Sequence, residues 1–276
     1  MSQDMTPEEE WRALLTGTHP HQTRSSPFRH VPSAPRCKLC KAPFAGLGGA
    51  VFRRYGYSPW EKNPNICGRC FKGMTQHVQG CPTGDEEGRV GGAEVEVSML
   101  FADVRGSSEL ARRVSTREFT NLMQRFYTTS RAVLIDGDAI VEKFIGDEVA
   151  GLFLPFLTGP NHALRAIDVA RELVRAVGYG SPEGPWLPLG AGVHTGTAFV
   201  GMVASGGVAD FTALGDPVNL TAHLASQAAA GEILVSVDAV AASGLEDHDG
   251  ERRHVSLKGH PLDVVALLPA PSLTTT

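Results

Sequence analysis

The chain has 276 residues, of which 42% are hydrophobic and 20% are charged, a composition typical of globular proteins rather than disordered ones. No apolar run reaches the roughly 18 residues that a membrane-spanning helix needs. The first residues are acidic and lack the basic and apolar segments of a secretion signal. We therefore predict a soluble, cytoplasmic protein with no membrane partner.

The net charge of −5 is unevenly distributed along the sequence. Residues 11–76 carry eleven Lys or Arg and one acid, Glu61, for a net charge of +10. Residues 1–10 carry −4, and residues 77–276 carry the remaining −11. The basic stretch indicates a solvated basic face, a surface for an acidic partner, or one half of an internal docking pair.

Four of the five cysteines form two Cys-x-x-Cys pairs, Cys37 with Cys40 and Cys67 with Cys70. Paired thiolates on two tight turns suit a tetrahedral Zn²⁺, and metal binding would offset the scarcity of apolar residues between them. The 26 residues between the pairs exceed the spacing of common zinc ribbons. Iron–sulfur ligation and unmetallated cysteines therefore stay open as alternatives to the predicted single structural Zn²⁺ per chain.

Composition divides the chain into four parts. A capped helix at 7–15 precedes a linker rich in Pro, Ser, His and Arg, and a second linker rich in Gly and acidic residues follows the cysteines. Beyond that linker the pattern changes to alternating strands and helices. The predicted parts are an N-terminal segment and linker at 1–36, the cysteine module at 37–81, the second linker at 82–92, and a larger domain at 93–270.

Period-two and period-3.6 apolar patterns alternate along the larger domain. The predicted strands are 94–103, 139–145, 149–154, 187–194, 197–203, 209–214, 232–237, 252–257 and 263–268. The predicted long helices are 116–134, 161–177 and 217–229. The order β-α-β-β-α-β predicts an α+β fold with a ferredoxin-like core and a C-terminal extension.

Two segments of this domain carry carboxylates where strands end. An apolar strand ends at Asp103, and the small residues Gly106 and Ser107 then open a helix, so that a hard oxygen ligand lies beside backbone amides. This arrangement suits a metal-bound polyphosphate, or equally an aspartate that caps the helix. Further on, Asp147 lies at a hairpin tip and Lys143 lies inward along the strand, although a Gly-Asp pair in a hairpin is usually only a turn.

A third segment runs from Thr212 in a strand to Asn219 and His223, which lie four apart on one helix face. Capping and surface positions are the alternative interpretation of these polar residues. Together with residues 191–196, and in this order, the three segments resemble the class III adenylyl and guanylyl cyclases. The resemblance implies a cyclase homology domain over residues 93–270.

The resemblance also implies adenine as the base. Lys143 and Thr212 match the two base-recognising positions, and guanylyl cyclases typically have glutamate at the lysine position. Asn219 matches the asparagine that orients the ribose. The implied site residues are Asp103, Val104 and Asp147 for two Mg²⁺ or Mn²⁺ ions; Lys143, Thr212, Gly106, Ser107 and Lys258 for ATP; and Asn219 and His223 for catalysis.

One position departs from the family. Four residues after Asn219 the family usually has an arginine that stabilises charge on the α-phosphoryl group, and this sequence has His223. Histidine is shorter and lacks the forked donors of arginine. The expected function is an adenylate cyclase that makes cyclic AMP and pyrophosphate in signalling. The alternative is a catalytically weak homologue that binds nucleotide and regulates a partner.

In the family, the residues of one active site come from two subunits. The resemblance therefore implies a homodimer with two symmetric sites, in which the aspartates come from one chain and the base-recognising residues from the other. A third hypothesis is that the basic cysteine module binds nucleic acid under the control of the cyclase domain.

Overall fold

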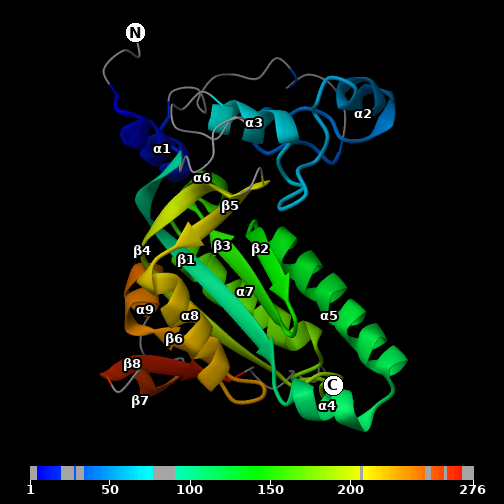
Figure 1. The fold of residues 1–276 in the computed structure, drawn as a ribbon, viewed down its shortest axis with the longest axis vertical. Helices are drawn as coiled ribbons and strands as arrows, with labels where there is room; N and C mark the ends of the chain where they lie inside the picture. Colours follow the sequence, from blue (N-terminus) through cyan, green and yellow to red (C-terminus); the bar gives the residue numbers. More distant parts are fainter. Residues whose placement is uncertain are drawn as a thin grey trace, which may run out of the picture. The chain divides into compact units, whose positions relative to one another are not determined.

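The computed structural model describes residues 5–19, 28, 34–76, 91–205, 208–245, 250–257 and 260–268 (Figure 1). The chain groups into two compact units. The N-terminal unit comprises Met1–Val95, Leu154–Gly159 and Thr197–Leu214, and the sheet unit comprises Glu96–Phe153, Pro160–Gly196 and Gly215–Thr276. In the part of the chain that is described, no helix is both long enough and apolar enough to cross a membrane.

The sheet unit is built on strands in the order β2-β3-β1-β4-β6-β8-β7. The first four strands of this order, with the helices between them, form the predicted ferredoxin-like core, and the last three form the C-terminal extension. The strands are β1 (Gly91–Val104), β2 (Ile140–Ile145), β3 (Glu148–Phe153), β4 (Leu189–Ser205), β6 (Ile233–Ser236), β7 (Glu251–Leu257) and β8 (His260–Leu267). The helices are α4 (Ser107–Arg113), α5 (Thr116–Asp136), α7 (His162–Ala176), α8 (Asp216–Gln227) and α9 (Val237–Ser243).

The two faces of this sheet carry different helices. Side chains of α5, α7 and α9 pack with β1, β3, β4 and β6 in one large buried cluster, which includes Phe126, Leu134 and Ile167. On the opposite face of β6, Leu234 packs against Leu224 of α8. Because successive strand residues point to opposite faces, β6 contributes to both layers.

Local signals fix the ends of α5. Ser115 and Glu118 form a reciprocal capping box at its start, in which each side chain accepts a hydrogen bond from the other residue's backbone N–H. After α5 the chain turns at Gly137, where a Cβ atom would lie 2.2 Å from Val169 of α7. Glycine is therefore needed at this position for the close approach of the chain to α7.

The N-terminal unit combines short helices with a hairpin. Helix α1 begins with the predicted cap, a capping box between Thr6 and Glu9 followed by a proline, and it buries Trp11. The outer part of β4 pairs with β5 in antiparallel register, with Thr212 opposite Gly201. The elements are α1 (Pro7–Thr16), α2 (Gly46–Arg53), α3 (Gly68–Gln76), α6 (Pro155–Thr158) and β5 (Val208–Leu214).

The structure corrects several predicted elements. The strands predicted at 187–194 and 197–203 form one strand, β4, and Gly91 and Gly92, predicted as linker, belong to β1. A Cβ atom on Gly92 would lie 2.5 Å from the carbonyl oxygen of Val200, so this glycine permits close strand approach rather than flexibility. Helices α2, α3, α6 and α9 were not predicted. Lys258, Cys81 and most of the linker at 82–92 lie outside the described residues, and the division into four parts stays a prediction.

Candidate active site and cysteine cluster

The end of β1 and the tip of the β2–β3 hairpin bring Asp103 and Asp147 close together. Strands β1 and β3 are antiparallel, with Asp103 opposite Glu148. The backbone N–H of Val104 donates to the carbonyl oxygen of Asp147 over 3.0 Å. Gly146 adopts a left-handed φ of 60°, which permits the tight turn that presents Asp147. The two predicted metal-binding aspartates thus come from neighbouring strands.

The electrostatic environment of Asp103 and Asp147 favours a bound cation. Burial raises the pKa of Asp103; Arg105 lowers it and the charge of Asp147 raises it further. Burial also raises the pKa of Glu148, and both aspartates add to that shift. Carboxylates that repel one another in a half-buried place are stabilised by a divalent ion, and their hard oxygens are the ligands that Mg²⁺ and Mn²⁺ prefer. The residues present therefore fit the predicted metals.

Two polar side chains hold the aspartates. The guanidinium of Arg105 forms an ion pair with the carboxylate of Asp103 and donates to the carbonyl oxygen of Ser226 over 2.6 Å. The hydroxyl of Ser107, the first residue of α4, donates to the carboxylate of Asp147. Arg105 had no predicted role, although its position two residues after Asp103 was the available signal. Its positive charge partly balances Asp103.

Lys143 lies on β2, where the register between β2 and β3 shifts between Val141 and Lys143. Its Nζ atom is 3.0 Å from Oε1 of Glu142. The lysine side chain is partly exposed and the glutamate side chain is nearly buried. The amine that the sequence assigns to base recognition is therefore paired with its neighbouring carboxylate.

Asn219 and His223 lie on α8 as predicted, in a helix that begins at Asp216 after Gly215. Asn219 is exposed. The Nε2 atom of His223 is 2.8 Å from the carbonyl oxygen of Ser256 on β7. A carbonyl oxygen only accepts, so Nε2 carries the proton of this hydrogen bond. The structure thus ties the imidazole to the backbone of β7, a contact that the sequence did not predict.

Thr212 lies on β5 in the N-terminal unit and is buried. The preceding residue on this strand, Phe211, is also buried. The remaining predicted residues of the nucleotide site that the structure describes belong to the sheet unit. Lys258, the predicted triphosphate lysine, lies outside the described residues.

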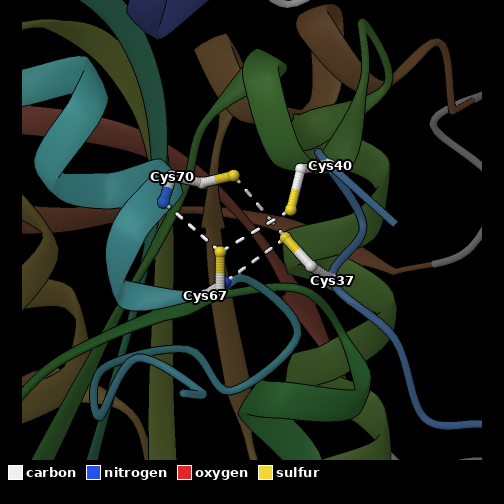
Figure 2. A group of neighbouring side chains, drawn as sticks. All are labelled: Cys37, Cys40, Cys67 and Cys70. Carbon is white, nitrogen blue, oxygen red and sulfur yellow. Dashed lines mark hydrogen bonds between the residues drawn. The ribbon is translucent and has the colours of Figure 1, made fainter. Parts of the chain in front are cut away.

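The four cysteines of the two Cys-x-x-Cys pairs converge, with all four Sγ atoms within 4.8 Å of one another (Figure 2). Cys37 and Cys70 are 3.8 Å apart at their Sγ atoms, and Cys40 and Cys67 are 3.7 Å apart. A tetrahedral ion with Zn–S bonds of about 2.3 Å requires sulfur atoms about 3.8 Å apart. The observed separations match this requirement, and they are too long for disulfides.

Backbone donors complete the cluster. The N–H of Cys70 donates to Sγ of Cys67 and the N–H of Cys67 donates to Sγ of Cys37, each over 3.3 Å. Among the four thiols, hydrogen bonds to Cys37 raise the pKa of Cys67 and Cys70, and hydrogen bonds from the neighbouring thiols hold the pKa of Cys37 well below its ordinary value. Such donors stabilise thiolate, the form that binds metal. The chemistry of this donor set therefore fits a structural Zn²⁺.

The family model for the adenylate and guanylate cyclase catalytic domain matches residues 92–267. Among curated relatives, the uncharacterized protein Rv1318c of Mycobacterium tuberculosis is 30% identical over 184 residues, which are 63% of this chain and 32% of that protein. Rv1320c of the same organism is 27% identical over 180 residues, 63% of this chain and 31% of that protein. This chain thus matches only about a third of the length of these relatives.

Solved structures share the fold. The guanylyl cyclase Cya2 has a TM-score of 0.58 and 24% identity, covering 66% of this chain and 97% of its own. The adenylyl cyclase CyaB from P. aeruginosa has a TM-score of 0.54 and 24% identity, covering 68% and 98%. Because the matching family model covers residues 92–267, well over half of its length, the chain belongs to the adenylate and guanylate cyclase catalytic-domain family.

Proposed function

We propose that the protein is an adenylate cyclase, a phosphorus–oxygen lyase that converts ATP to 3′,5′-cyclic AMP and pyrophosphate in cytoplasmic signalling. The observation that carries this proposal is the convergence of Asp103 and Asp147 at the end of β1 and the tip of the β2–β3 hairpin. Two carboxylates at one place suit a reaction in which a hydroxyl attacks phosphorus and a polyphosphate leaves.

Each residue of the site has a proposed part. Asp103 and Asp147, with the main chain of Val104, would hold two divalent ions, and Gly106 and Ser107 would bind the phosphates. Bound Mg²⁺ or Mn²⁺ would supply charge neutralisation and lower the pKa of the ribose 3′-hydroxyl. Ser107 and the backbone of Val104 orient Asp147, so its carboxylate needs little rearrangement when the site fills.

The preference for adenine rests on the chemistry of Lys143. An ammonium group only donates, which suits the acceptor nitrogen N1 of adenine, whereas guanine presents a donor there. The hydroxyl of Thr212 can accept from the 6-amino group of adenine. The Lys143 amine is paired with Glu142, which compensates the ammonium charge.

We further propose that the active form is a homodimer with two shared sites. One chain would supply Asp103 and Asp147, and the other would supply Lys143, Thr212 and the α8 residues Asn219 and His223. Asn219 would orient the ribose, and its exposed position on α8 leaves it accessible to a ligand. ATP and a second copy of the chain are the proposed partners.

A second candidate function is nucleotide sensing with little turnover. The hydrogen bond from His223 to the carbonyl oxygen of Ser256 favours it, because this donor is already used within the chain. A residue engaged in this way gives less stabilisation to a transition state than a free arginine.

One assay separates the candidates. Purified protein is incubated with ATP or GTP, each with Mg²⁺ and with Mn²⁺, and both cyclic nucleotides are measured alongside nucleotide binding. Cyclic AMP production well above cyclic GMP production supports the adenylate cyclase. Binding of ATP without any cyclic nucleotide supports the sensor, and cyclic GMP as the main product contradicts the assignment of Lys143.

A further inference from the structure

The segment between the two cysteine pairs contacts β5. Lys62, whose side chain is 15% exposed, has its Nζ atom 2.6 Å from Oδ1 of Asp210. The same amine donates to the carbonyl oxygen of Phe211 over 2.9 Å. Both contacts are with the two residues that immediately precede Thr212. Lys62 and the β5 residues 210–212 all belong to the N-terminal unit.

Aromatic packing adds a second contact. Trp60 stacks on Phe71 with ring centroids 3.9 Å apart and planes inclined by 13°. Phe211 meets both rings edge-on, at 6.1 Å from Trp60 and 5.6 Å from Phe71. These are favourable aromatic geometries, and they leave Phe211 only 3% exposed.

The cysteine cluster fixes both of these rings. Pro59 forms a β-bridge with Cys67, and the N–H of Trp60 donates to the carbonyl oxygen of Ile66 over 2.9 Å. Phe71 follows Cys70 directly, and its N–H donates to the carbonyl oxygen of Cys67 over 3.1 Å. Movement of the second cysteine pair would therefore move Trp60 and Phe71 with it.

Strand β5 pairs with β4 alone among the described strands, so its other edge is available for contacts of this kind. Alternation along the strand directs Phe211 to one face and both Asp210 and Thr212 to the other. The module thus holds the residue before Thr212 by its ring and its carbonyl oxygen, and it holds Asp210 by its carboxylate. These contacts restrict where the Thr212 side chain lies.

We propose that the cysteine module positions Thr212, with Lys62 and Phe211 as positioning residues, so that metal at the four cysteines controls recognition of the base. This inference rests on the proposed function, because Thr212 affects base recognition only if the site binds nucleotide. The module then acts on the substrate site indirectly, through the position of Thr212. Loss of its metal weakens nucleotide recognition although no cysteine contacts the nucleotide.

Hydrogen exchange tests the coupling without any assay of activity. The full chain, as purified and after removal of metal with a chelator, is compared by exchange of the amides in β5 and in β6. We expect faster exchange in β5 on metal removal, restored by added Zn²⁺, and unchanged exchange in β6. Unchanged exchange in β5 after proven metal loss would overturn the proposal.

Kinetics of three variants test the consequence. Lys62→Ala should raise KM for ATP by about threefold to tenfold with a smaller change in kcat, since it alters positioning for binding rather than the reacting atoms. Lys62→Arg, which keeps a cation for Asp210, should restore most of the loss. Lys72→Ala removes a charge from the exposed face of α3 and serves as the matched control with unchanged KM.

The outcomes separate this inference from the function on which it rests. An unchanged KM in Lys62→Ala, or a loss confined to kcat, contradicts the positioning role while the wild type still makes cyclic AMP. A wild type that makes no cyclic nucleotide contradicts the proposed function instead. In that case ATP binding affinity replaces KM, and the exchange experiment still decides whether the metal holds β5.

Discussion

The cysteine module and the sheet unit achieve their packing by different means. The sheet unit buries a continuous apolar cluster in which Phe126, Leu134 and Ile167 are wholly excluded from solvent. Between residues 37 and 76, by contrast, cysteines account for two of the most deeply buried side chains, Cys37 and Cys67. The sheet unit is stabilised mainly by burial of apolar area, whereas we expect the stability of the module to depend on metal bound by its four sulfur atoms.

Because the two regions are stabilised differently, three kinds of change should act on different parts of the molecule. A substitution of a site carboxylate should remove chemistry and spare both units. Loss of metal should unfold the module and spare the sheet core. A cavity in the apolar cluster should lower the stability of the sheet unit and leave the metal in place.

The largest expected effect is on activity. Asp103→Ala or Asp147→Ala should reduce cyclic AMP production to the level of a control without enzyme, because each removes a proposed ligand of both ions. Circular dichroism should show both variants folded, since neither side chain is part of the apolar cluster. Asp136→Ala, at the exposed end of α5, is the matched control. Substantial activity in either site variant would contradict the assignment.

Mixing experiments sharpen this prediction. Asp103→Ala combined with Lys143→Ala should regain part of the activity, because a heterodimer contains one complete site if the sites are shared between chains. Fluorescent labels on the two variants establish that subunits exchange. Exchange without any recovery would count against shared sites.

The second-largest expected effect is that of metal loss on the cysteine module. We expect about one zinc per chain by elemental analysis, and Cys67→Ser should lose it because Cys67 is a buried member of the four-cysteine cluster and a proposed ligand. Proteolysis should then cut within residues 37–70 while the sheet unit stays resistant. Cys81→Ser, outside the two pairs, is the control. Iron with visible absorbance, or wild-type protein without metal, would refute the zinc assignment.

A cavity in the sheet core is the third test. Phe126→Ala should lower the free energy of unfolding by about 3–5 kcal/mol, the usual cost of removing a buried phenyl group. Denaturant unfolding measures the loss, and the zinc content should not change. Asn121→Ala, on the exposed side of the same helix, should cost much less. Equal effects of the two substitutions would show that α5 does not pack as described.

These regions also differ in how far the sequence predicts them. The 3.6-residue apolar periodicity of α5 predicts that helix well, and the structure adds a capping box at Ser115 that fixes where it begins. Helix α2 was missed, since glycines at its start resemble a loop. A Cβ atom on Gly49 would lie 2.6 Å from the backbone of Phe44, so this glycine serves close packing within the module. Such tertiary contacts leave no periodic pattern in the sequence.

The same limit applies to the candidate site. Motif spacing assigns Asp103, Asp147 and His223 to a strand end, a hairpin tip and a helix, and the structure has these elements. Their partners could not be predicted: Arg105 bonds to Ser226, 121 residues away, and His223 bonds to β7. Contacts between distant segments follow from the fold, which the motifs do not contain.

The fourth prediction concerns His223, within the sheet unit. If the site lacks the donor that arginine would supply, His223→Arg should raise kcat by about tenfold or more, up to the roughly 10²–10³ that one transition-state donor typically contributes. KM should change less, because the new contact belongs mainly to the transition state. His254→Arg adds the same charge at an exposed position of β7 and is the control. Equal kcat in wild type, His223→Arg and His223→Ala would show that this residue takes no part.

The smallest expected effect is an acid sensitivity of the sheet unit that does not involve the metal. Burial lowers the pKa of His162 below its ordinary value of 6.5, although the carboxylate of Glu96 opposes the shift. Burial likewise lowers the pKa of His194, opposed by Asp238 and Asp216. Both imidazoles are therefore neutral in the folded chain at pH values where the unfolded chain already binds protons.

The sign of the effect follows from this difference in proton binding. The two histidines contribute fully to the free energy of unfolding above pH 6.5, and this contribution falls as the pH drops from 6.5 toward the pKa values of the folded chain. The loss is at most about 1.4 kcal/mol per pH unit for each histidine. Thermal unfolding between pH 5 and 8, monitored on the sheet unit, should show this slope equally with and without chelator. His162→Gln should flatten it, because glutamine does not titrate and can still bond to Ser98. A slope that disappears with the metal would instead assign the acid sensitivity to the thiolates of the cysteine cluster.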